Sequence, residues 1–149
     1  MHQVLTGVTI SNGIQWAADG RHVYYNDTPT GRIDRYTFDP ATGTVGDRVT
    51  FATVDGSAGW PDGMALDAEG GVWVALWGGG AVHRYAPDGT LTDRITVPVR
   101  QTTACTVGGT TLYITTSRDG LGDTAEPAAG AAFAADIGVA GAAQHAFAA

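Results

Sequence analysis

The sequence predicts an all-β fold, and three observations support this prediction. Glycine occupies 22 of the 149 positions, about twice the usual share of ~7%. Short apolar runs alternate with turn-forming stretches such as "ADG", "TPTG", "AEGG" and "PDG". A motif also recurs, because "NGIQWAADG" at 12–20 aligns with "DGMALDAEG" at 62–70, and "TACTVGGTTLYI" at 103–114 is a weaker third copy. The copies follow one another at intervals of about 40–50 residues, and repeats of this length with four strands each are typical of β-propeller blades.

Each repeat divides into four short segments that we expect to be strands. The expected strands span residues 13–17, 22–27, 32–39 and 47–55, then 63–68, 72–77, 81–86 and 92–98, then 102–107, 111–117, 131–137 and 143–148. The runs "VYY" at 23–25 and "VWVALW" at 72–77 are apolar at consecutive positions. This pattern indicates strands covered on both faces, although a short buried helix would show it too.

The last 25 residues carry the weakest signal. Alanine fills 13 of positions 125–149, so propensity alone would favour a helix. Gly130, Gly138 and Gly141 interrupt such a helix. We therefore expect two strands that complete the third repeat.

The repeats form a single domain in this interpretation, since 149 residues suit one domain. The three expected blades span about 10–58, 59–100 and 101–149. Propellers typically close with about 4–8 blades, and three blades would leave two broad apolar faces open to water. The sequence therefore predicts half of a six-bladed propeller, completed by a missing segment or by a second copy of the chain.

Composition excludes several function classes. The net charge is −7, and basic residues do not cluster, which argues against binding to nucleic acid or to an anionic membrane. No apolar run of about 18 residues and no secretory leader is visible. Cys105 is the single cysteine, so no internal disulfide can form. These features favour a cytoplasmic protein whose partner is a metal cation or a neutral or weakly charged small molecule.

Asn12 and Asp62 hold the same place in the first two repeats. Each precedes a glycine, so both could be turn residues. Equivalent positions of successive blades, however, converge on the mouth of a propeller's channel. Amide and carboxylate oxygens are suitable ligands for Ca²⁺ or Mg²⁺, and the carboxylate also suits Zn²⁺. We therefore expect a metal site, with a further ligand from elsewhere because the third repeat offers only the neutral Thr103.

Other candidate residues receive structural interpretations. Asp27 is expected to be a turn residue, and Trp77 is expected to pack between blades. Trp60, beside Pro61, is equally compatible with packing and with the wall of a pocket. His83 is expected at the surface and Cys105 in the interior. The sequence lacks a G-x-S-x-G motif, so a serine-hydrolase mechanism has no support.

Several of these motifs together resemble the SMP-30/gluconolactonase/regucalcin family. The resemblance rests on "SNGIQW", on "PDGMALDAEGGVWVALWGGGAVHRY" and on "PVRQTTACTVGG". It covers nearly the whole chain but only the C-terminal half of the family's usual length. It implies a six-bladed propeller that binds one divalent cation, Ca²⁺ or Zn²⁺ with Mg²⁺ and Mn²⁺ as alternatives, and hydrolyses a sugar lactone.

The resemblance also implies roles for the two aligned residues. Asn12 and Asp62 would be metal ligands, and Asp62 would also be the catalytic general base. The family's glutamate ligand has no counterpart in this sequence, and no substrate-binding residue can be named. Activity would therefore require the missing N-terminal blades or a partner chain. The alternative is a non-catalytic half-propeller that serves as an interaction module, or an inactive truncated product.

Overall fold

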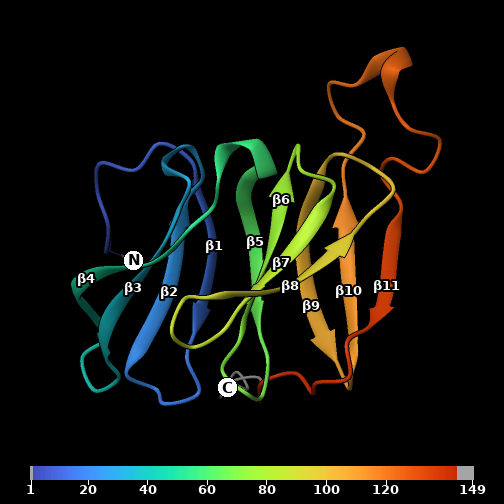
Figure 1. The fold of residues 1–149 in the computed structure, drawn as a ribbon. Helices are drawn as coiled ribbons and strands as arrows, with labels where there is room; N and C mark the ends of the chain where they lie inside the picture. The colour runs from blue at the N-terminus through green and yellow to red at the C-terminus, as the bar shows by residue number, and fades with distance from the viewer. Residues whose placement is uncertain (1, 144–149) are drawn as a thin grey trace.

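The structure is all-β, as predicted. The computed structural model describes residues 2–143, which form three antiparallel sheets lying side by side in chain order (Figure 1). The helices in this part of the chain are three single 3-10 turns, Thr28–Thr30, Gly56–Ala58 and Gly122–Thr124. None of the described helices is long and apolar enough to cross a membrane.

The strands follow one another in each sheet from one edge to the other. Sheet 1 contains β1 (Ser11–Trp16), β2 (His22–Asp27), β3 (Arg32–Asp39) and β4 (Thr44–Thr53). Sheet 2 contains β5 (Trp60–Leu66), β6 (Val72–Trp77), β7 (Ala81–Tyr85) and β8 (Leu91–Thr96). Sheet 3 contains β9 (Thr102–Gly108), β10 (Thr111–Thr116) and β11 (Ala132–Asp136).

The expected strand positions are confirmed for these eleven strands, with ends that differ by a few residues. The alanine-rich tail does form a strand, β11, within the expected segment 131–137. The expected strand at 143–148 lies outside the described residues except for its first position. Sheet 3 therefore has three strands in the described part of the chain, and the expected four-stranded count holds for sheets 1 and 2.

Strand β6 lies between two apolar cores. Val72, Val74 and Leu76 point into the core between sheets 1 and 2. Trp73 and Ala75 alternate with them and point into the core between sheets 2 and 3. Every one of these five residues is buried, which explains why the run lacks a polar position and confirms that both faces of β6 are covered.

The first strands of the three sheets contact each other directly, β1 with β5 and β5 with β9. Side chains reinforce these contacts at the backbone. The Gln15 side-chain amide of β1 donates to the Met64 carbonyl of β5 at 3.2 Å. At the beginning of β9, the Thr102 hydroxyl donates to the Leu76 carbonyl of β6, the strand paired with β5, at 2.6 Å. The beginnings of β1, β5 and β9 consequently lie close together at one end of the molecule.

The prediction that His83 lies at the surface is wrong, because the residue is buried. It belongs to β7, which lies between β6 and β8, and its ring contacts Tyr85 with Nδ1 3.3 Å from the phenol oxygen. Burial lowers the pKa of His83, and the charge of Arg94 lowers it further.

Cys105 is buried as expected, and burial raises the pKa of its thiol to about 12, so it is not an activated nucleophile.

Candidate functional site

Asn12 and Asp62 lie near the beginnings of β1 and β5, within the strands and not in turns. The pairing register shifts at both places, between Ser11 and Ile14 in β1 and between Pro61 and Met64 in β5. Neither following glycine has a positive φ angle. The two dipeptides therefore mark β-bulges, which change the direction in which a strand side chain points.

The glycines after these residues allow the sheets to touch. A Cβ atom on Gly13 would lie 2.5 Å from the backbone oxygen of Asp62. A Cβ atom on Gly63 would lie 2.6 Å from the Cβ of Ala104 and 2.9 Å from the backbone oxygen of Thr103. Close approach of the strands thus brings the Asn12 position next to Asp62, and the Asp62 position next to Thr103.

Two side chains that the sequence analysis did not single out hold this arrangement. The Thr28 hydroxyl accepts a hydrogen bond from the Asn12 amide at 3.1 Å and donates one to the Pro61 carbonyl at 2.9 Å. The Asn26 amide donates to the Asp62 carbonyl at 2.7 Å, and Asn26 is almost completely buried. The end of β2 and the 3-10 turn after it therefore fix both the side chain of Asn12 and the backbone around Asp62.

The environment of the Asp62 carboxyl group makes it a better base than an exposed aspartate. Burial raises the pKa of Asp62, while the Asn12 side chain and the Gly63 N–H lower it by a smaller amount. Asp62 is half-buried. A carboxylate with an incomplete set of partners can take up a proton or a cation.

The donor set suits part of a divalent cation's coordination sphere. Asn12 and Asp62 supply hard oxygen atoms of the kind that Ca²⁺ and Mg²⁺ prefer. The Asn26 Oδ1 atom, behind Asp62, is buried without a hydrogen-bond partner in the described structure. Among residues 2–143, however, no three His, Cys, Asp or Glu side chains gather as a metal site.

An apolar pocket of about 230 Å³ adjoins the site. Its lining is formed by Ile10, Thr28, Pro29, Trp60 and Trp77. Of the two roles considered for Trp60, the pocket wall is therefore observed. Trp77 pairs with Trp60 across β5 and β6 and lines the same pocket. Its packing between blades stays a prediction.

Asp27 has a structural role near this pocket. Its carboxylate accepts hydrogen bonds from the backbone N–H groups of Thr9 and Ile10 at 3.1 and 2.8 Å. It therefore fixes the segment that leads into β1, and both carboxylate oxygens already have partners.

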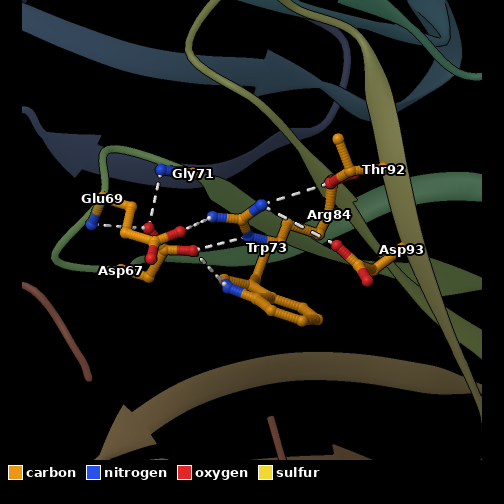
Figure 2. A network of polar contacts seen from close by, with 7 residues as sticks. All are labelled: Asp67, Glu69, Gly71, Trp73, Arg84, Thr92 and Asp93. Carbon is orange, nitrogen blue, oxygen red and sulfur yellow. Dashed lines mark hydrogen bonds and ion pairs between the residues drawn. The ribbon is translucent and has the colours of Figure 1, made fainter. Parts of the chain in front are cut away.

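A second polar cluster, which the sequence analysis did not identify, lies at the other end of β5 around Asp67 (Figure 2). The Asp67 carboxylate accepts hydrogen bonds from the Gly71 N–H at 2.7 Å, the Trp73 indole at 2.9 Å and the Arg84 guanidinium at 2.7 Å. Arg84 also pairs with Glu69 at 3.0 Å. Because every oxygen of Asp67 is engaged, this cluster braces the β5–β6 connection against β7.

Comparison with known proteins agrees with the resemblance seen in the sequence. The family model described as "SMP-30/Gluconolactonase/LRE-like region" matches residues 1–118. The chain belongs to the SMP-30/gluconolactonase family. Pentonolactonase XacC of Haloferax volcanii is 38% identical to this family member, with 93% of the chain and 51% of the relative covered. Human regucalcin is 36% identical, with 95% of the chain and 50% of the relative covered.

Solved structures of family members show the same fold. A calcium-binding regucalcin from Agrobacterium tumefaciens superposes with a TM-score of 0.86 at 37% identity, covering 93% of this chain and 50% of that one. A gluconolactonase from Xanthomonas campestris gives a TM-score of 0.64 at 28% identity, covering 74% of this chain and 36% of that one. This SMP-30/gluconolactonase chain spans about half the length of the curated relatives it matches.

Proposed function

We propose that this chain is part of a metal-dependent lactonase in which Asn12 and Asp62 bind the cation and Asp62 activates water. The observation that supports the proposal best is the convergence of these two residues. Bulges in the first strands of two neighbouring sheets and close glycine contacts bring an amide and a half-buried carboxylate together. The relatives named as lactonases make lactone hydrolysis the reaction that this arrangement fits.

The cation would be held by the Asn12 amide oxygen, by one oxygen of Asp62 and by at least one ligand from beyond the described residues. Ca²⁺ is the first candidate because a similar structure is a calcium-binding regucalcin, and Zn²⁺, Mg²⁺ and Mn²⁺ are the alternatives. When bound, such a cation supplies Lewis-acid polarisation of the lactone carbonyl.

The reaction itself adds one water molecule to the lactone. Asp62 accepts a proton from this water as its oxygen forms a bond to the carbonyl carbon. The ring C–O bond then breaks, and the leaving oxygen takes up the proton that Asp62 accepted, so that Asp62 is a carboxylate again and the product is a hydroxy acid. Asn12 takes part in no proton transfer in this scheme, because its contribution is to bind the cation and to orient Asp62.

The partner implied by this function is a small lactone, with sugar lactones as the leading class because the relatives carry such names. We infer that the three sheets are half of a six-bladed propeller, which a longer chain or a second copy would complete. The net charge of −7 is unfavourable for nucleic acids and anionic membranes. A cytoplasmic location stays a prediction from the sequence.

The test measures hydrolysis of D-glucono-δ-lactone by the full-length gene product with Ca²⁺, Zn²⁺, Mn²⁺ or Mg²⁺ and with a chelator. We expect activity only with a cation, and we expect Asp62→Ala to lower kcat/KM by about a thousandfold or more. Asn12→Ala should chiefly weaken cation affinity, as measured by calorimetric titration.

Two results would refute the proposal. One is an Asp62→Ala variant whose activity stays within about twofold of the parent, since a general base contributes far more than this. The other is equal hydrolysis in the presence and absence of the chelator. Asp47→Asn, which changes an exposed carboxylate on β4, is the matched control and should leave both measurements unchanged.

A further inference from the structure

The pocket formed by Ile10, Thr28, Pro29, Trp60 and Trp77 shares a residue with the candidate metal site. Thr28 lines the pocket and also contacts the Asn12 amide. Trp60 lies two residues before Asp62 on the same strand. A molecule bound at Asn12 and Asp62 would therefore meet this pocket with one of its substituents.

The chemistry of the lining selects against polar substituents. Apart from two indole N–H groups, the five lining residues offer one polar side-chain group, the Thr28 hydroxyl. This hydroxyl already accepts from Asn12 and donates to the Pro61 carbonyl. Sugar hydroxyl groups placed in the pocket would lose hydrogen bonds to water without replacement, which is unfavourable.

The exposure and size of the pocket also point to a bound group. Trp60 is 44% exposed and Ile10 is 50% exposed, so two large apolar side chains face solvent beside a polar site. The volume of about 230 Å³ is below the ~300–1,000 Å³ of pockets that enclose a whole ligand. It is suited to one substituent of a molecule whose remainder lies at Asp62.

From these observations we propose that the Trp60–Trp77 pocket binds an apolar, alkyl-type substituent of the lactone substrate. This inference rests on the proposed lactonase function for the identity of the reacting group. The pocket would determine specificity, since each methylene buried against the indole rings should strengthen binding about fourfold. Lactones with an alkyl chain would then be preferred over unsubstituted lactones of the same ring size.

Binding can be measured without any reaction. The probes are γ-octalactone and γ-butyrolactone, added to the purified 149-residue chain while tryptophan fluorescence is recorded. We expect saturable quenching or a spectral shift with γ-octalactone at concentrations about tenfold or more below those needed with γ-butyrolactone. Trp60→Ala and Ile10→Asn should abolish this difference, and Trp60→Phe should retain part of it.

Trp16→Ala is the matched control, because Trp16 is a comparably exposed indole at 38% and lines a different pocket with Phe38. It should leave the preference for γ-octalactone unchanged. Trp60 and Ile10 both lie at the surface and are about half exposed, so their substitution should preserve the fold, which circular dichroism checks. Equal affinity for the two lactones in the parent chain, or an undiminished preference in Trp60→Ala, would overturn the inference.

Hydrolysis by the metal-loaded full-length gene product separates this inference from the function on which it rests. If both γ-lactones are hydrolysed at equal kcat/KM, the lactonase stands and the pocket assignment is wrong. If neither these γ-lactones nor D-glucono-δ-lactone is hydrolysed but γ-octalactone binds and Trp60→Ala loses it, the pocket stands and the catalytic proposal fails. We expect γ-octalactone to be hydrolysed with at least about tenfold higher kcat/KM, a ratio reduced by Trp60→Ala.

Discussion

At the scale of single residues, Asp62 and Asp67 show how one strand gives two carboxylates opposite properties. Asp62 stands at the beginning of β5 with few partners, and burial raises its pKa. Asp67 directly follows the same strand. Burial also raises the pKa of Asp67, but hydrogen bonds from Arg84, Gly71 and Trp73 outweigh this effect and hold it below the ordinary value. The Asp62 carboxylate can accept a proton more readily than an exposed aspartate, whereas the Asp67 carboxylate is held ionised in a network that stabilises the fold.

The Asp67 cluster yields a prediction about stability. Asp67→Asn should lower the free energy of unfolding at pH 7 by about 3 kcal/mol, because it removes the buried partner of Arg84 and weakens the hydrogen bonds that the carboxylate accepts from Gly71 and Trp73. The native pKa of Asp67 is depressed, so its contribution is complete above about pH 4 and is lost as the pH falls through the native value. Urea unfolding at pH 7, 5 and 3 measures both effects.

The parent chain should therefore lose stability on acidification more steeply than Asp67→Asn in this range. The control is Asp47→Asn, because Asp47 is exposed on β4 and should change the unfolding free energy by less than about 0.5 kcal/mol. Parallel stability curves for the parent and Asp67→Asn between pH 5 and 3 would show that Asp67 is not the group responsible.

The sequence could reveal the candidate site only through residues that repeat. Asn12 and Asp62 are recognisable because they occupy one place in two aligned copies. Thr28 and Asn26 act on them through contacts between sheets, and such contacts leave no periodic signal along the chain. The surface position predicted for His83 is wrong. A histidine beside Arg84 is typical of an exposed position, whereas β7 is an inner strand of sheet 2 and His83 is buried.

At the scale of strands, the pattern of apolar residues predicts where each strand lies in the sequence but not which strands of different sheets contact each other. The unbroken run at 72–77 predicted that β6 is covered on both faces, and its alternate residues do enter two different cores. The bulges at Asn12–Gly13 and Asp62–Gly63 were not predicted, because N-G and D-G dipeptides are also common in turns. Only the neighbouring sheet explains why glycine follows each polar residue.

The close contact between β5 and β9 gives a prediction at this scale. Gly63→Ala should destabilise the chain by about 1–3 kcal/mol, because the new methyl group would press on Ala104 in β9 and the structure must shift. The Cβ would lie 2.6 Å from the Ala104 Cβ and 2.8 Å from its Cα. Urea unfolding measures the loss, and the displacement of Asp62 should weaken cation binding in parallel.

Gly56→Ala is the matched control for this substitution. A Cβ at Gly56 would have no heavy atom within 4 Å, and its φ angle is not positive. It should therefore alter stability by less than about 0.5 kcal/mol. Equal effects of Gly63→Ala and Gly56→Ala would mean that the sheets can separate at β5 and β9 without cost, and the site geometry would then lack its structural cause.

At the scale of the whole molecule, the two outermost sheets each expose apolar side chains on the face turned away from sheet 2. In β1, Gln15 points to sheet 2, so its neighbours Ile14 and Trp16 point the other way, and both are exposed. In β10, Leu112 and Ile114 face sheet 2, and Tyr113 between them is 51% exposed. We infer that these two faces are where further sheets of a propeller would pack.

This arrangement predicts that the purified 149-residue chain associates with itself, because burial of two apolar faces is favourable and pairing the outer sheets of two copies covers both. Light scattering after size-exclusion chromatography should give a dimer at micromolar concentration. Ile14→Asp and Tyr113→Asp should each shift the chain towards monomer, since an unpaired charge opposes burial.

Leu91→Asp is the control, because Leu91 is 49% exposed but lies on β8, at the edge of sheet 2 farthest from β5. A chain that stays monomeric at every concentration, or a dimer that persists in both variants, would show that these faces are not the contact surfaces and would remove the packing argument for a larger ring.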